Sequence, residues 1–255
     1  MKSLCSLSIL IFLAGCTALE IKIPVASIKS PEVVREHMHQ LNFVAAPTKT
    51  FTVTSNINTR PLVISNEVTD SSYLSAEYNY GVIDYFTLGA AMNSDGGSQI
   101  QLQYQFLNDV VEDIGWSAAV QFGLNCCGSR KKGLSDTGLQ GPGTYESAGE
   151  LSLTAFNPSV SAGYRFNKNI MGYIGVSYSS FSVVSKIQQT ASTDGLDFGG
   201  SFSQSNSGNS QSLGAGLQFD LGGFHLKPSA QWTEFHLAGQ NKQSMLSSLT
   251  ISFNR

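Results

Sequence analysis

The chain has 255 residues and a net charge of -3, and charged residues make up 13% of it, roughly half of the ~25% expected of a soluble domain. The balance is filled by 36 serines and 25 glycines, and mean hydropathy is -0.03. These values exclude a bundle of apolar spanning helices. They also argue against nucleic acid as a partner, because phosphate binding needs a concentrated basic surface.

Residues 1–15 have the features of a secretory signal peptide. Lys2 supplies a positive charge, and the apolar stretch 4–13 is too short to cross a ~30 Å hydrocarbon core as a helix. Leu13-Ala14-Gly15-Cys16 resembles the lipobox of bacterial lipoproteins. The resemblance implies cleavage before Cys16 and acylation of its sulfur and amine, which makes lipid (palmitate) the expected anchor. The alternative is an ordinary signal peptide with an accidental cysteine.

Residues 16–49 lack any strand pattern that we recognise and are predicted to form a periplasmic linker. Ser30-Pro31-Glu32 is typical of a helix start, with Pro at the first helical position. Val34, Met38 and Leu41 then follow at helical spacing. The sequence thus predicts a short amphipathic helix, which rests on the periplasmic rim, fills the barrel as a plug, or is merely part of a tether.

Residues 50–255 are predicted to form an all-β domain. In 114–125, apolar side chains from Ile114 to Leu124 occupy every second position, as in a strand with one oily and one small-polar face. A weaker first strand is expected within 50–66. The other expected strands are 72–81, 84–93, 98–109, 114–125, 150–166, 170–187, 211–220, 223–238 and 244–253.

Two features favour a membrane barrel over a soluble β-sandwich, which remains the structural alternative. Aromatic residues gather near the segment ends, as an interfacial girdle requires. Tight links alternate with long ones, of which 126–149 and 188–210 are the longest, and outer-membrane barrels have short turns at one rim and long loops at the other. Strands span lipid only as a closed barrel, because lipid leaves stray backbone groups without partners.

The hairpin from Tyr80 to Gly89 resembles one common in bacterial outer-membrane barrel families, in which Tyr-Gly and Asp flank the periplasmic turn. The final alternation of Leu249, Ile251 and Phe253 resembles the terminal strand that the barrel-assembly machinery recognises, although Asn254 and Arg255 follow the Phe. The resemblance implies a closed antiparallel barrel, with ten strands expected and eight or twelve as alternatives. Both termini and the lipid on Cys16 are then expected at the periplasmic leaflet of a Gram-negative outer membrane.

Few charges are predicted to face the lumen, and they are Glu77, Arg165 and Lys227. In a narrow ten-stranded interior, opposite charges meet at reduced effective dielectric. They are expected either to form an internal ion-pair cluster that fills the lumen or to line a constriction that selects solutes.

Cys126 and Cys127 open the longest predicted loop, and in an oxidising compartment they form a vicinal disulfide, stay reduced or bond to another molecule. Neighbouring α-carbons lie ~3.8 Å apart, closer than disulfides prefer, so the vicinal bond would be strained. Arg130, Lys131 and Lys132 follow, and they either contact lipopolysaccharide phosphates or are simply solvated.

No coherent catalytic constellation, metal site or cofactor site is predicted. Glu234-Phe235-His236 is similar to one element of the omptin proteases, but Glu replaces Asp and the paired-Asp element is missing. The leading expectation is therefore a non-enzymatic structural or surface-interaction barrel, whose partners are outer-membrane lipid, envelope proteins or cell-surface proteins. The alternatives are a small-solute pore and an outer-membrane hydrolase.

Overall fold

The computed structural model describes residues 16–25, 28–56, 63–94, 97–108, 114–136, 143–193 and 196–254. They contain eleven strands, and the strand bounds are β1 Cys16–Pro24, β2 His39–Asn56, β3 Val63–Ile83, β4 Phe86–Asn93, β5 Ser98–Asn108, β6 Gly115–Asp136, β7 Gly143–Asn167, β8 Ile170–Thr193, β9 Leu196–Asp220, β10 Phe224–Leu237 and β11 Gln240–Asn254. The described part of the chain holds no helix, and so none that is long and apolar enough to cross a membrane.

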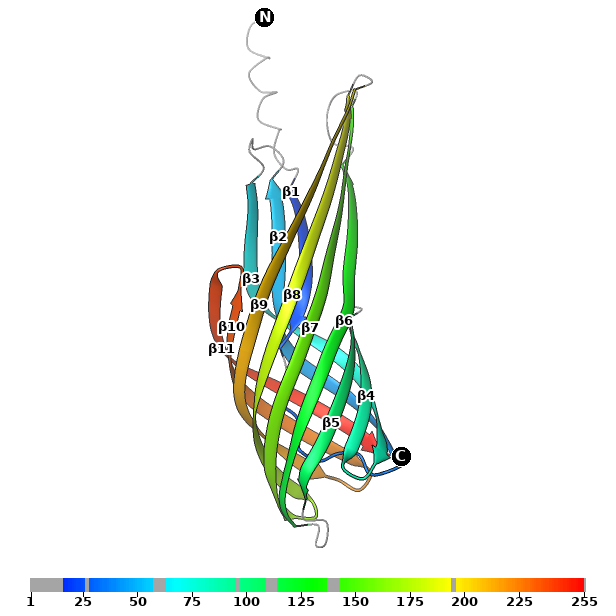
Figure 1. The fold of residues 1–255 in the computed structure, drawn as a ribbon, viewed down its shortest axis with the longest axis vertical. Coiled ribbons are helices and arrows are strands. Elements are labelled where there is room, and N and C mark those ends of the chain that lie inside the picture. The colour runs from blue at the N-terminus through cyan, green and yellow to red at the C-terminus, as the bar shows by residue number, and fades with distance from the viewer. Residues whose placement is uncertain are drawn as a thin grey trace, which may run out of the picture.

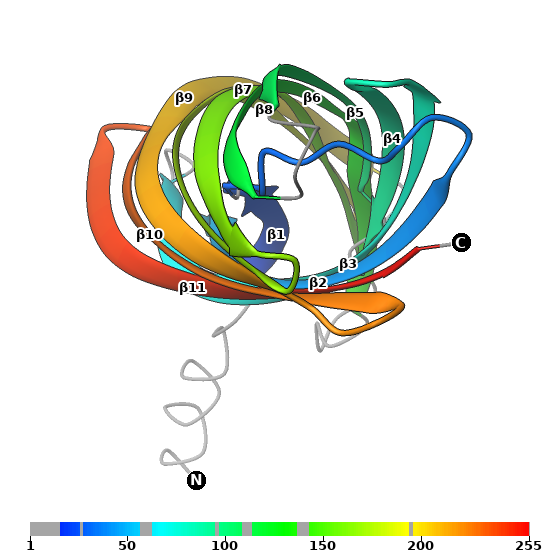
Figure 2. The ribbon, with the colours of Figure 1, turned by 90° about the horizontal axis from the view of Figure 1, so that it is seen from below.

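The sheet is antiparallel and returns on itself. Each strand from β2 to β11 pairs with the next along the chain, and β11 pairs back to β2 through Gln40–Ala45. Figure 2 shows the resulting ring. Strand β1 is an addition, because it pairs only with the far half of β2, from Thr48 to Asn56. The predicted all-β antiparallel barrel is confirmed.

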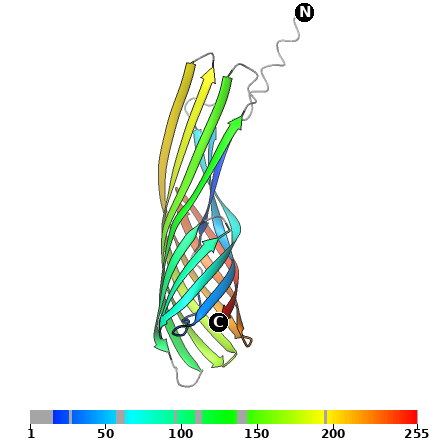
Figure 3. The ribbon, with the colours of Figure 1, turned by 90° about the vertical axis from the view of Figure 1, so that its right-hand side faces the viewer.

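The different strand lengths divide the molecule into two parts. We call the closed ring near the C-terminus the barrel. We call the far part the head, made of β1, residues 48–56 and 63–74 of β2 and β3, the far ends of β6–β9 and the end of β10 from Phe235 to Leu237. Strands β7, β8 and β9 have 25, 24 and 25 residues, whereas a tilted strand needs only about 9–11 to span a membrane. Figures 1 and 3 show these strands projecting well beyond the barrel.

Polar and apolar residues exchange faces between barrel and head. Along β8, Ser177 and Ser179 point inward in the barrel, and Phe181 and Val183 point inward in the head. In the barrel the outward positions are large and apolar, with Ile174 62% exposed. At the boundary, β2 buries both of its faces at Thr48, Lys49 and Thr50. Successive side chains continue to alternate between the two faces of the strand through this boundary, and only the face that carries the apolar residues changes.

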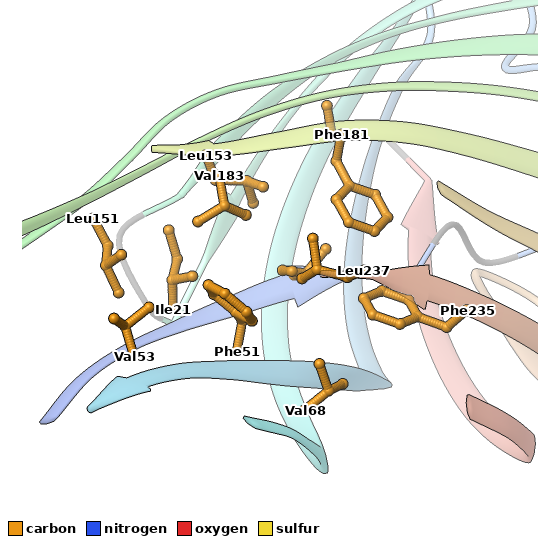
Figure 4. Close-up of a cluster of buried hydrophobic side chains, with 12 residues drawn as sticks. Ile21, Phe51, Val53, Val68, Leu151, Leu153, Phe181, Val183, Phe235 and Leu237 are labelled. Carbon is orange, nitrogen blue, oxygen red and sulfur yellow. The ribbon is translucent and has the colours of Figure 1, made fainter. Parts of the chain in front are cut away.

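The head has a dry core of its own. Twelve buried side chains from β1, β2, β3, β7, β8 and β10 pack together, and Phe51, Val53, Leu151, Val183 and Phe235 are fully buried. Phe181 stacks on Phe235 with ring centroids 5.1 Å apart. Figure 4 shows the side chains of β1 and β2 facing those of β7 and β8. The head is therefore a two-layer packing whose interior excludes water.

Several predictions made for the N-terminal half are wrong. The helix expected after Ser30 does not form, and β2 begins at His39 instead of within 50–66. Residues 40–46 alternate as a strand, with Leu41 and Phe43 outside and Asn42 and Val44 inside. Val34, Met38 and Leu41 have the spacing of one face of a helix by coincidence. Val34 is buried in the lumen, whereas Met38 and Leu41 are exposed on the outside. The expected first strand, 50–66, instead spans the end of β2 and the start of β3.

Cys16 and the end of β11 also lie at opposite ends of the sheet rather than at one rim. Cys16 pairs with Asn56 at the far end of β2, whereas Asn254 pairs with Gln40 at its near end. The long loops expected at 126–149 and 188–210 are largely strand, because β6–β9 continue as paired hairpins. In β9, serine at the exposed positions from Ser201 to Ser207 removes the contrast between an apolar and a polar face by which a strand is recognised.

Candidate functional site: the occupied lumen

The interior of the barrel is occupied by the segment that links β1 to β2. Residues 28–36, which we call the plug, form neither a helix nor a strand and run from the head down to the rim where β2 starts. At that rim the His37 amide donates to the Gly81 carbonyl at 2.9 Å, and the Gly81 amide donates to the Met38 carbonyl at 3.1 Å. The chain thus passes along the lumen before it becomes part of the wall.

One charged residue of the plug is held by the β3 side of the wall. Lys29 Nζ lies 2.7 Å from Glu77 Oε2 and donates to Gln101 Oε1 at 2.7 Å. Asn42 Nδ2 donates to the same Glu77 oxygen at 3.2 Å. The Glu77 side chain is 6% exposed, so Lys29 supplies the counter-charge that this carboxylate needs inside the protein.

A second charged residue of the plug, Glu32, is held by the opposite part of the wall. Arg165 Nε and Nη2 donate to the Glu32 carboxylate at 2.7 and 2.5 Å, a bidentate arrangement. Gln218 Nε2 donates to Glu32 Oε2 at 2.8 Å. Arg165 also pairs with Asp220, which in turn bonds to His225. Lys29 and Glu32 therefore attach the plug to strands on both sides of the ring.

The plug backbone is satisfied by wall side chains rather than by a strand. The Val33 amide donates to Gln105 Oε1 at 3.1 Å, and the Val34 amide donates to Thr87 Oγ1 at 2.9 Å. Gln103 Nε2 donates to the Ser30 and Glu32 carbonyls at 3.0 and 3.3 Å. The alternate glutamines of β5 thus serve as hydrogen-bond partners that an extended peptide needs when it is removed from water.

Glycine makes room for the plug where it leaves the lumen. A Cβ on Gly81 would lie 1.9 Å from the Arg35 carbonyl oxygen, a backbone atom that cannot move aside easily. Only glycine therefore lets the plug approach β3 this closely.

The three predicted lumen charges do not pair with one another. Glu77 and Arg165 each pair with a plug residue, and Lys227 forms no ion pair with a described residue although Glu32 and Asp220 lie in its electrostatic surroundings. The prediction lacked Lys29 and Glu32. Their signal was a pair of opposite charges, three residues apart, in a segment with no strand pattern, and the Ser-Pro-Glu helix signature concealed it.

The remaining candidates lie apart from the lumen. Cys126 and Cys127 are in β6, where the β6–β7 register shifts between Asn125 and Gly128, and their disulfide stays a prediction. Arg130, Lys131 and Lys132 continue β6 opposite Leu151, Glu150 and Gly149. Glu234 and His236 lie 3.5 Å apart, on either side of the inward-pointing Phe235. The structure brings none of these residues to the plug.

Comparisons with known proteins find solved structures of outer-membrane barrels. Ail, the attachment invasion locus protein of Yersinia pestis, is 15% identical with a TM-score of 0.34, and the match covers 87% of this chain and all of that one. Neisserial surface protein A is 11% identical with a TM-score of 0.30, over 85% and 95% of the two chains. The CymD monoaromatic hydrocarbon channel is 9% identical with a TM-score of 0.32, over 87% and 89%. No family model and no curated protein matches the chain.

Proposed function

We propose that this chain is an outer-membrane β-barrel of a Gram-negative cell. Its own plug closes the barrel to solutes, and its β-sheet head makes contacts at the cell surface. The outward face of the barrel supports the membrane location. It presents large apolar side chains, among them Leu102, Phe122, Ile174, Val176 and Leu217. Aromatic pairs such as Trp116–Tyr164 and Phe43–Phe253 lie near its rim, as expected of an interfacial girdle.

The closed state is supported by the bonds between the plug and the barrel wall. The side chains of Lys29 and Glu32 and the amides of Val33 and Val34 are bound to the barrel wall, and a dry apolar core lies above the plug in the head. A solute would have to displace both layers. The pore alternative is therefore disfavoured, and the geometry favours a structural, surface-contact role.

Planar-bilayer recording tests the closed state. We expect the purified full chain to pass no steady current. Lys29→Ala/Glu32→Ala/Phe235→Ala should pass current, because both charged attachments of the plug and the stacked ring of the head core are lost. Asp84→Ala/Lys168→Ala/Phe224→Ala is the matched control, since it also removes one charge of each sign and one phenylalanine ring, but from exposed positions outside the plug. A steady large conductance through the unaltered protein would contradict the proposal.

We also propose that Cys16 carries the lipid anchor. With long hairpins outside and tight turns in the periplasm, the register of β1 puts Cys16 on the outer side, about 50 Å along β2 from the C-terminal rim at roughly 3.3 Å per residue. The lipid would then lie on the head side rather than at the periplasmic leaflet. Labelled palmitate should enter the full chain but not Cys16→Ser, and an epitope tag placed after Cys16 should be accessible on intact cells.

Contacts with other envelope components follow from the same orientation. Arg130, Lys131 and Lys132 lie on the outer side, where lipopolysaccharide phosphates are the matching ligands. Near the end of the terminal strand β11, Phe253 lies opposite Leu41, in keeping with the assembly-machinery signal proposed for it. Charge reversal of the three cations should weaken lipopolysaccharide co-purification without changing the folded barrel.

A further inference from the structure

The head has four strand edges whose backbone pairs on one side only. Strand β1 pairs with β2 alone, and residues 63–74 of β3 extend beyond β4, whose pairing stops at Ser75–Asn93. Residues 127–136 of β6 extend beyond β5, and residues 196–207 of β9 extend beyond β10, whose pairing stops at Gly208–Leu237. Alternate peptide groups along each edge face away from the sheet, and no described strand pairs with them.

Three of these edges carry the features that block pairing with other chains. Strand β1 holds Glu20, Lys22 and Pro24, and the β3 edge holds Glu67 and Asp70. The β6 edge holds Arg130, Lys131, Lys132 and Asp136. Charged residues and proline on an edge discourage the addition of a further strand.

The β9 edge lacks those features. Residues 196–207 contain one charged residue, Asp197, at the tip of the head, and no proline. The outward side chains Ser201, Ser203, Ser205 and Ser207 are exposed, and a Cβ on Gly200 would meet nothing within 4 Å. The edge is about 40 Å long at ~3.3 Å per residue, and an extended strand can add to it through main-chain hydrogen bonds.

We propose that this edge pairs with the β9 edge of a second copy that projects from a facing membrane, and that the chain thereby joins two cells. This inference rests on the proposed orientation, with the head outside. Two copies in one membrane present β9 strands that run in the same direction, whereas copies in facing membranes present them antiparallel, the arrangement that pairs more stably.

The sequence of the edge is compatible with pairing to itself. In an antiparallel register centred on Phe202, Ser201 of one copy lies opposite Ser203 of the other, and Asp197 lies opposite Ser207. No like charges meet. The same self-pairing through the β6 edge would oppose clusters of cations, which destabilises cross-strand pairs. Of the four edges, β9 is the one suited to a second copy.

A charge-swap experiment tests the pairing. The full chain is reconstituted with heads outward in phosphatidylethanolamine–phosphatidylglycerol vesicles, and clustering is followed by light scattering. Vesicles with the unaltered protein should cluster. Vesicles with Ser201→Lys/Ser203→Lys, or with Ser201→Asp/Ser203→Asp, should stay dispersed, because like charges lie opposite each other. A mixture of the Lys and Asp vesicles should cluster again.

The controls separate pairing from general effects of charge and folding. Thr154→Lys/Ser180→Lys adds the same charge to outward positions of β7 and β8 that are not on an edge, and it should cluster like the unaltered protein. Each variant must migrate as a folded, heat-modifiable barrel. Clustering with protein-free vesicles would indicate lipid as the partner and overturn self-pairing.

Two other results would overturn the proposal: dispersed vesicles of the unaltered, folded protein, or a Lys–Asp mixture that fails to recover clustering. Both leave the plugged barrel intact, because bilayer current tests that conclusion separately.

Discussion

The barrel and the head are built from the same strands but have opposite interiors. In the barrel, the plug and glutamine, serine and asparagine side chains fill the inside, and apolar residues face outward. In the head, Phe51, Phe181 and Phe235 fill the inside, and serine dominates the outward face of β9. The difference is the one that the proposed location predicts, with lipid around the barrel and water around the head, since apolar surface turns away from water and toward lipid.

The two regions also differ in how they are held together. The head depends on apolar packing, whereas the lumen depends on hydrogen bonds and two ion pairs of the plug. Substitutions that remove one kind of interaction and leave the other therefore test whether the two regions are held together differently.

The largest expected effect is loss of the head core. Phe235→Ala removes a fully buried ring that stacks on Phe181, and such truncations cost about 3–5 kcal/mol. We expect the head to become protease-sensitive while the barrel keeps its heat-modifiable migration. Phe224→Ala, at the half-exposed outward start of the same strand, is the control and should change little. Equal proteolysis of both variants would mean that the head has no separate core.

An intermediate effect is expected from reversing a plug charge. Lys29→Glu places a carboxylate next to Glu77, whose side chain is nearly buried, so we expect a loss of several kcal/mol in urea unfolding, as for a broken buried pair. Lys29→Glu/Glu77→Lys restores opposite charges and should recover much of the stability. If the double variant is no more stable than the single one, the two residues do not interact directly.

The smallest expected effect is at Lys227. This residue has no ion pair with a described residue, so Lys227→Met should leave the urea-unfolding midpoint unchanged or raise it slightly. Arg165→Met is the comparison, because it leaves Glu32 and Asp220 without the ion-pair partner that they share. A large loss of stability for Lys227→Met would show that the lumen depends on this cation after all.

The sequence predicts the barrel well where its two faces differ. Strands such as β5 and the near half of β8 alternate apolar and polar residues, because one face lies outside the barrel and the other faces the lumen. It fails where both faces have similar chemistry, as in the serine-rich far half of β9, or where the polar–apolar order reverses, as after Ser179.

The plug could not be found by periodicity at all. Its backbone bonds to Gln105 and Thr87, residues far along the chain, and its charges match Glu77 and Arg165 only once the ring has closed. A local signal such as Ser30-Pro31-Glu32 describes preferences of a free peptide, and tertiary contacts override them here.

Hydrogen exchange of the plug amides tests the central claim most directly. The amides of Val33 and Val34 are bonded to side chains of the barrel wall, so these two amides should exchange as slowly as those in the strands of the barrel. Exchange of these two amides at the rate of an unstructured peptide, in a protein whose strands remain protected, would contradict an occupied lumen.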